Sequence, residues 1–323
     1  MTVLVTGGAG YIGAHIVEAL DGDVVVVDNL STGHLERLPG LPLLVADLAE
    51  AGAAERLTEF MLEHRVDSVI HLASLKQVGE SMDEPVRYYR QNLDGLMTVL
   101  EAMTAASVRD LVFSSSAAVY GNTDGGTITE GATTAPVNPY GETKLAGEWL
   151  VRSAALAHGL RAVCLRYFNV AGAARAELGD RIAMNLIPML FERIDAGEDP
   201  LVFGGDYPTV DGSCVRDFVH VVDLAEAHVA TLADLERSAE PFRVLNVGTG
   251  HGTSVLEMVR VVGSVIGRSL EPEVVARRAG DPAEVVASAQ RIADEIGWRA
   301  RLDVEEMVRS AWESHLALTV DEH

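Results

Sequence analysis

Residues 2–13 read TVLVTGGAGYIG, and this stretch decides the fold. The run Thr2–Thr6 is rich in β-branched apolar residues, which predicts a buried strand, and apolar residues at helical spacing follow the turn. Gly7, Gly10 and Gly13 lie between the two, where missing side chains let the backbone approach a pyrophosphate at a helix N-terminus. The stretch therefore predicts a strand, a phosphate-binding turn and a helix.

Similar apolar runs recur along the first half of the chain, with helical stretches between them. They predict strands at residues 23–28, 43–46, 68–71, 110–113 and 162–166. Near-continuous apolar strands that alternate with helices are typical of a parallel sheet covered on both faces. We therefore expect an α/β fold, a Rossmann-type doubly wound parallel sheet, as an NAD-binding domain over residues 1–168.

The alternation loosens after residue 168, which predicts a smaller C-terminal α/β substrate domain over residues 169–323. A strand is expected at 215–220 and a helix near 184–194. Ser254 and Glu257 match a capping box that opens a helix to about residue 266. We expect the chain to return to the first domain around residues 243–266.

Composition narrows the class of protein. The 323 residues contain no apolar run of membrane-spanning length, and the net charge of −23 would repel a nucleic-acid backbone. The two cysteines cannot form a disulfide framework, and the ten histidines are scattered without a ligand cluster. We expect a cytoplasmic protein with no membrane, nucleic-acid or metal partner.

The second predicted strand ends in Asp28. A carboxylate at this place, after a glycine loop, accepts hydrogen bonds from both ribose hydroxyls of a dinucleotide. It would also repel a 2′-phosphate, and no basic residue follows until His34 and Arg37. The sequence therefore favours NAD over NADP as the cofactor.

Tyr140 and Lys144 are four residues apart on a helix that Pro139 begins, so they share one face. A neighbouring ammonium favours the phenolate, and we expect it to lower the tyrosine pKa toward neutrality. The chain has only two lysines, Lys76 and Lys144, against 23 arginines. A compact ammonium suits a crowded site better than a guanidinium, so both lysines are expected near the ligand.

Residues 114–116, three serines, end a strand at the edge where open α/β sheets bind ligands. One of these hydroxyls can hold a substrate hydroxyl for the tyrosine. A Tyr-x-x-x-Lys pair alone would be weak support for a site. Together with the glycine loop and the serine run, it predicts a proton-transfer site beside a dinucleotide.

Six motifs then identify a family. They are TGGAGYIG at 6–13, DNLSTG at 28–33, SSSAAVYG at 114–121, NPYGETK at 138–144, RYFNVAG at 166–172, and FGGDYPTVDGSCVRDFVHVVDLAEAH at 203–228. The chain resembles the nucleotide-sugar branch of the extended short-chain dehydrogenases/reductases, in particular the UDP-glucose 4-epimerase family. The resemblance implies an isomerase of galactose metabolism and a homodimer that holds NAD tightly in its N-terminal domain, with a UDP-hexose as substrate.

The resemblance also implies a mechanism and a set of residues. Tyr140 would take the proton of the sugar 4-hydroxyl while hydride passes from C4 to NAD, and the 4-keto sugar would turn over before hydride returns. Ser116 and Lys144 would be the other catalytic residues. The implied cofactor contacts are Gly7, Gly10, Tyr11, Ile12, Gly13, Asp28, Asn29, Asp47, Leu48, Leu72, Lys76, Asn92, Ser114, Tyr140, Lys144 and Phe168. The implied substrate contacts are Lys76, Ser116, Tyr140, Asn169, Asn185, Leu186, Phe203, Arg216, Arg278, Asp281 and Val285.

Two departures from the family pattern bear on the substrate. The loop at 173–184 is shorter than expected, which loosens the alignment of Asn185. Val285 replaces a bulky tyrosine that some epimerases carry against the sugar, so UDP-N-acetylhexosamines are expected to fit as well.

Three rival functions make different demands on the sequence. A 4,6-dehydratase needs acidic residues where this chain has Ala117 and Ala118. A UDP-glucuronate 4-epimerase, or another NAD-dependent enzyme that modifies nucleotide sugars, stays open because the hydride step is shared. A non-catalytic dinucleotide sensor predicts loss of Tyr140 or Lys144, and both are present.

Overall fold

The computed structural model describes residues 1–123, 125–182, 184–278 and 280–320, in two compact units. The first unit comprises Met1–Gly121, Thr133–Tyr167 and Ala225–Leu245. The second unit comprises Asn122–Ala132, Phe168–Leu224 and Asn246–His323.

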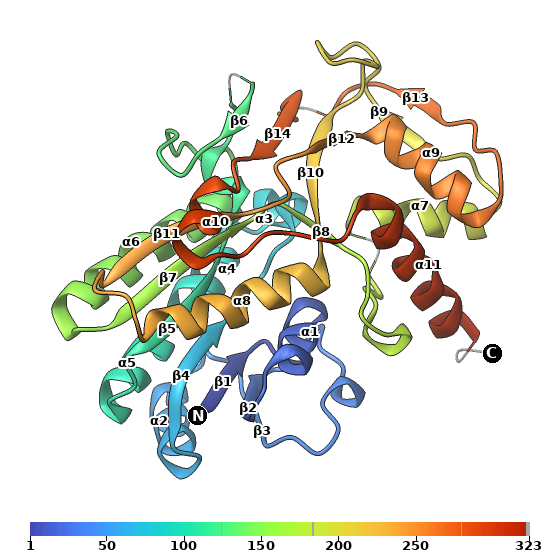
Figure 1. Ribbon diagram of the computed structural model, residues 1–323. Coiled ribbons are helices and arrows are strands. Elements are labelled where there is room, and N and C mark those ends of the chain that lie inside the picture. The colour runs from blue at the N-terminus through green and yellow to red at the C-terminus, as the bar shows by residue number, and fades with distance from the viewer. Residues whose placement is uncertain (124, 183, 279, 321–323) are drawn as a thin grey trace. The chain divides into compact units, whose positions relative to one another are not determined.

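The first unit is built on a seven-stranded sheet in the order β11-β7-β5-β4-β1-β2-β3 (Figure 1). Neighbours from β3 through β7 pair in parallel, and the order 3-2-1-4-5 is that of the Rossmann fold. The predicted fold class is confirmed. The strands are β1 (Thr2–Thr6), β2 (Asp23–Asp28), β3 (Leu43–Val45), β4 (Val66–His71), β5 (Asp110–Ser116), β7 (Arg161–Tyr167) and β11 (Phe242–Val247).

Helices cover both faces of this sheet. Apolar side chains of α2, α5 and α6 pack with the strands in one buried cluster, while α1 lies on the opposite face (Figure 1). The helices and helical turns of the first unit are α1 (Tyr11–Ala19), η1 (Leu35–Arg37), α2 (Ala53–Glu63), α3 (Val78–Asp83), α4 (Pro85–Tyr89), the π-helical η2 (Arg90–Asp94), α5 (Gly95–Ala106), η3 (Ala117–Tyr120) and α6 (Pro139–His158), with most of α8 (Val221–Leu235).

The second unit contains a five-stranded mixed sheet and a two-stranded one. In the larger sheet β10 is central, antiparallel to β12 and parallel to β14 and β8. The elements of the second unit are β6 (Thr127–Ile128), β8 (Asn169–Ala171), η4 (Ala176–Leu178), α7 (Leu186–Asp195), β9 (Leu201–Phe203), β10 (Val215–His220), β12 (Gly252–Ser254), α9 (Val255–Ile266), β13 (Glu273–Val275), β14 (Glu284–Ala287), α10 (Gln290–Ile296) and α11 (Val304–Val320).

The second unit has its own core, in which α7, α9 and α11 pack together around Val202 and Phe218. Because the apolar face of α9 belongs to this core, the return of the chain differs from the predicted 243–266. The first unit takes back residues 225–245 instead, and β11 adds a strand beside β7.

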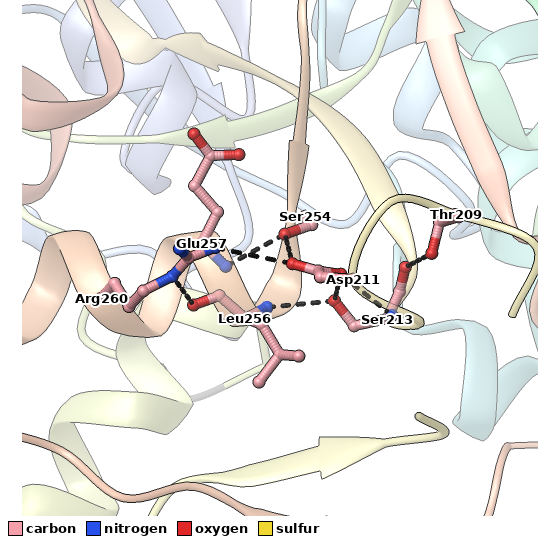
Figure 2. A network of polar contacts seen from close by, with 7 residues as sticks. All are labelled: Thr209, Asp211, Ser213, Ser254, Leu256, Glu257 and Arg260. Carbon is pink, nitrogen blue, oxygen red and sulfur yellow. Dashed lines mark hydrogen bonds and ion pairs between the residues drawn. The ribbon is translucent and has the colours of Figure 1, made fainter. Parts of the chain in front are cut away.

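A polar network fixes the loop between β9 and β10 to the start of α9 (Figure 2). Asp211 accepts hydrogen bonds from the Ser213 hydroxyl (2.8 Å) and the Ser254 hydroxyl (2.5 Å). Ser254 caps α9 by accepting from the Glu257 N–H (3.0 Å), as predicted, and Ser213 accepts from the Leu256 N–H (3.1 Å). The loop is thus held at the first turn of a helix.

Among the described residues no helix is long and apolar enough to cross a membrane.

Candidate active site

The glycine loop joins β1 to α1 in the shape that a phosphate cradle needs. Gly7 has φ +72°, and a Cβ on Gly13 would lie 2.2 Å from the Gly7 carbonyl oxygen, so neither position tolerates a side chain. Gly10 is the N-cap of α1 and provides no side-chain cap. The first turn of α1, which includes Tyr11 and Ile12, thus begins directly after the glycine turn, and helix N-termini of this kind bind anions.

Four of the expected cofactor contacts gather at the ends of β2 and β3. The buried Asp28 carboxylate accepts from the N–H groups of Ala9 (3.0 Å) and Leu30 (2.8 Å) and keeps acceptor capacity for a ribose. Burial raises the pKa of Asp28, and these two hydrogen bonds partly offset the rise. The Asn29 amide donates to Asp47 (3.5 Å), while the expected neighbour Leu48 is buried.

Lys144 is buried, and the end of its side chain is held by two serines. Its Nζ donates to the Ser74 hydroxyl (2.9 Å), the Ser114 carbonyl (2.9 Å) and the Ser114 hydroxyl (3.3 Å). Burial lowers the pKa of Lys144 to about 7. Ser74 follows β4 and was missed in the sequence, although its place after a strand was a usable signal.

Tyr140 lies one helical turn before Lys144, and the Lys144 Nζ is 5.9 Å from the centre of its ring. Burial raises the pKa of Tyr140, while a hydrogen bond with Ser116 lowers it. The prediction that Lys144 lowers the pKa of Tyr140 is therefore wrong, because the structure raises that pKa. The reason is that removing the phenolate from water outweighs the hydrogen bond, and Nζ points to the serines.

The loop after β4 carries the second lysine. Lys76 is exposed and makes no hydrogen bond or ion pair within the part of the chain that the structure describes. Its neighbour Leu75 is clamped by the buried Asn92, which accepts from the Leu75 N–H (2.8 Å) and donates to its carbonyl (3.1 Å). Leu72 donates its N–H to the Thr6 carbonyl (3.1 Å), which ties this loop to β1 beside the glycine turn.

Two further buried groups, which the sequence did not reveal, adjoin this site. A hydrogen bond with Ser114 lowers the pKa of Tyr167, although burial and the nearby Tyr140 hold it well above its ordinary value. The Tyr167 hydroxyl also bonds to His228 Nε2. Because β7 and α8 are far apart in sequence, no local pattern announces this contact.

In the second unit, Arg216 stands on β10 beside two other expected substrate residues. Its Nη1 donates to the carbonyl oxygens of Val215 and Pro282 (2.9 Å each), and its Nη2 lies 3.9 Å from Asp281. Val285 pairs with Arg216 across the parallel β10–β14 ladder. The structure thus brings Arg216, Asp281 and Val285 together.

The adjacent arginines Arg277 and Arg278 have different surroundings. Arg277 donates to the Asp206 carboxylate (2.6 Å) and lies over the Tyr207 ring, so its guanidinium is engaged within the protein. The Arg278 guanidinium lies 3.8 Å over the centre of the Phe203 ring. Two more of the expected substrate residues are therefore in contact. Stacking leaves the in-plane N–H groups of Arg278 free to meet a phosphate.

The remaining expected residues also lie in the second unit. Phe168 is buried, and Asn169 is exposed at the start of β8. Asn185 is the N-cap of α7 and donates to Asp180 (2.9 Å), and Leu186 begins that helix. Within the loop at 173–184, residue 183 lies outside the described residues. Among the described residues no group of His, Cys, Asp or Glu could hold a metal ion.

The fold, with a glycine turn after β1 and with Ser116, Tyr140 and Lys144 on adjoining elements, is that of a Rossmann-type protein of the dinucleotide-binding class. Residues 3–248 match the model of the NAD dependent epimerase/dehydratase family. The chain belongs to that family.

Individual relatives are similar over nearly their whole length. A UDP-glucose 4-epimerase of Azospirillum brasilense is 44% identical over 329 residues, which cover 98% of this chain and 93% of the relative. The crystal structure of a UDP-glucose 4-epimerase from Stenotrophomonas maltophila with bound NAD and formylated UDP-arabinopyranose is 39% identical, covers 99% of each chain and superposes with a TM-score of 0.94. A UDP-Glc/GlcNAc 4-epimerase from Campylobacter jejuni is 33% identical, covers 98% of this chain and 99% of its own, and superposes with a TM-score of 0.85.

Proposed function

We propose that the protein is an isomerase that interconverts UDP-glucose and UDP-galactose by epimerisation at C4, with NAD as its resident cofactor. The observation that carries the proposal is the juxtaposition of Ser116, Tyr140 and Lys144 at the end of β5, in a unit that also carries the glycine cradle. Full-length similarity to several UDP-glucose 4-epimerases supports it. The Asp28 carboxylate supports NAD, since it would repel a 2′-phosphate.

The residues of the first unit have distinct roles in this proposal. Tyr140, in its phenolate form, accepts the proton of the sugar 4-hydroxyl and later returns it, and Ser116, its hydrogen-bond partner, orients the 4-oxygen. Lys144, fixed by Ser74 and Ser114, positions the nicotinamide ribose and carries a proton near neutral pH. NAD, when bound, supplies the hydride acceptor for C4 and then the donor.

The residues of the second unit hold the nucleotide. Arg216 and Arg278 are the proposed ligands of the diphosphate, since charge-assisted bonds from a planar guanidinium fit its oxygens. Asp281, Phe203, Asn169, Asn185 and Leu186 are the other proposed UDP contacts. The sugar ring must turn over within the site during the reaction, so the protein must hold the substrate by its nucleotide.

A broader substrate range follows from Val285. A valine beside Arg216 leaves more room for a 2-acetamido group than a tyrosine would, and the Campylobacter jejuni relative is a UDP-Glc/GlcNAc 4-epimerase. We therefore include UDP-N-acetylhexosamines among the proposed substrates. Epimerisation of UDP-galactose without any turnover of UDP-N-acetylglucosamine would overturn this extension.

We also propose a homodimer and a cytoplasmic location. The neighbouring helices α5 and α6 expose Met97 (42% exposed), Trp149 (62%) and Leu156 (67%), and the last two share one helix face. Trp149→Glu should yield a monomer in light scattering, whereas an unchanged mass would exclude α6 from the interface. The buried, unpaired thiols of Cys164 and Cys214 support a reducing compartment.

The function is tested with the purified protein, first without and then with added NAD. UDP-galactose should be converted to UDP-glucose, as followed by nuclear magnetic resonance. UDP-glucuronate and UDP-N-acetylglucosamine are run in parallel. Exclusive turnover of UDP-glucuronate, or no turnover of any substrate even with NAD, would contradict the proposal.

A further inference from the structure

A buried polar network lies behind the catalytic helix α6. The Glu148 carboxylate accepts two hydrogen bonds from Arg166, from Nε at 2.8 Å and Nη2 at 2.6 Å. Glu148 also accepts from the Ser115 hydroxyl (2.5 Å), and Arg166 Nη1 donates to the Tyr120 hydroxyl (2.8 Å). All four residues are at most 5% exposed, so this is an ion pair inside the protein.

The network connects the elements that carry the chemistry. Glu148 is one turn after Lys144 on α6, and Ser115 lies between Ser114 and Ser116 on β5. Arg166 is the register partner of Ser115 across β5 and β7. The same four-residue set therefore ties the helix with the tyrosine and lysine to the strand with their serine partners.

Close packing leaves α6 little freedom in the turns that precede Glu148. A Cβ on Gly147 would lie 2.7 Å from the Phe113 ring, and one on Gly141 would lie 2.6 Å from the Ala118 carbonyl oxygen. Such contacts bring the helix close to β5 and to η3, which follows it, but they do not fix the position of the helix along the strand. Two parallel N–H···O bonds between a guanidinium and a carboxylate do supply a direction, because both must align at once.

We propose that Glu148 and Arg166, with Ser115 and Tyr120, are positioning residues that set the register of α6 on β5 and thereby hold Tyr140 and Lys144 at Ser116 and Ser114. This inference rests on the proposed epimerase function. A buried ion pair is poor support for stability, since well-packed apolar residues of similar volume replace one with little loss. What it provides here is geometry, and a misplacement of about 1 Å lowers an enzymatic rate on the order of 100-fold.

The same two strands supply a matched control at their other end. Asp110 and Arg161 are register partners that form a second two-pronged pair, with bonds of 2.5 and 2.6 Å. This pair lies five residues before the network along each strand, about 17 Å away. It resembles Glu148–Arg166 in chemistry, but α6 takes no part in it.

The test replaces the whole network with apolar residues of similar shape, as Ser115→Ala, Tyr120→Phe, Glu148→Leu and Arg166→Met together. The control protein carries Asp110→Leu and Arg161→Met. Each is assayed for thermal unfolding, retained NAD, and kcat and KM with UDP-galactose beside the wild type. The network variant should unfold near the wild-type temperature and keep its KM, while kcat falls about 10- to 100-fold. The control should keep its kcat.

A folded network variant with wild-type kcat would overturn the proposal, as would an equal loss of kcat in the control. If the network variant does not fold, Ser115→Ala decides alone: its kcat should fall severalfold at constant KM, and an unchanged kcat contradicts the inference. Because the wild type is measured in the same series, failure of the proposed function would show as an inactive wild type.

Discussion

The residues proposed for chemistry and those proposed for the nucleotide differ in how the protein holds them. Lys144 is buried and its Nζ makes three hydrogen bonds, and the helix that carries Tyr140 is fixed by Glu148. Arg278 and Asp281, in contrast, are exposed on the second unit. Chemistry needs controlled protonation and fixed distances, which burial supplies, whereas a nucleotide that must leave after turnover is better held by side chains near water.

This contrast predicts that damage in the first unit lowers kcat and damage in the second raises KM. Tyr140→Phe should show the largest effect, a fall in kcat of about 1,000-fold, because it removes only the proton acceptor. NAD should remain bound, as shown by its absorbance after denaturation. Tyr89→Phe, which removes a phenol that donates to Glu142 on the surface, is the control and should retain full activity. Activity that survives Tyr140→Phe would require another base.

On the nucleotide side, Arg216→Met should raise KM for UDP-galactose about 10- to 100-fold with a smaller change in kcat, since charged hydrogen bonds contribute about 1.5–3 kcal/mol. Arg278→Met should behave alike. Arg277→Met is the matched control, because its guanidinium already serves Asp206 and Tyr207, and its KM should stay within about twofold of wild type. An equal rise of KM for all three would show that the effect is general surface charge.

The burial of Lys144 makes stability depend on pH in a defined direction. Its pKa is about 7 in the folded chain and about 10.5 when exposed, so the unfolded state binds more protons between these values. Relative to Lys144→Met, the wild-type free energy of unfolding should rise with pH by about 1.4 kcal/mol per unit above pH 7. Urea titrations at pH 7, 8 and 9 measure this difference.

The nearby titratable groups are Tyr140, His71 and Cys164. Burial and the charge of Lys144 lower the pKa of His71 to about 3, and burial raises the pKa of Cys164, so neither titrates in this range. A flat difference between wild type and Lys144→Met would mean that the lysine keeps its ordinary pKa.

The smallest effect is expected where the loop joins α9. Ser254→Ala removes the cap of that helix and its bond to Asp211, which should cost about 1 kcal/mol of unfolding free energy. Ser264→Ala, exposed near the end of α9, should change the unfolding free energy by less than about 0.5 kcal/mol. Equal changes would show that the cap contributes nothing particular.

Local sequence patterns predicted the structure correctly where residues close together in the chain determine it. The strands β1 and β10 fall on the predicted residues, and Ser254 caps α9 as its spacing indicated. Tyr140 and Lys144 share a helix because four residues make about one turn.

The features that the sequence did not predict correctly depend on contacts between segments far apart in the chain. The apolar face of α9 predicts a helix but does not show which core the helix joins, so the predicted return at 243–266 lies later in the chain than the observed return at 225–245. The pairing of Glu148 with Arg166 joins a helix to a strand, and no spacing reveals it. The rise of the Tyr140 pKa depends on burial, which only the assembled fold determines.

In the proposed reaction, hydride leaves C4 and returns to the opposite face of the same sugar without exchange with water. UDP-galactose carrying deuterium at C4 tests this directly in ordinary water, with mass spectrometry of the UDP-glucose formed. The product should retain the deuterium at C4. Loss of the label to solvent would contradict it.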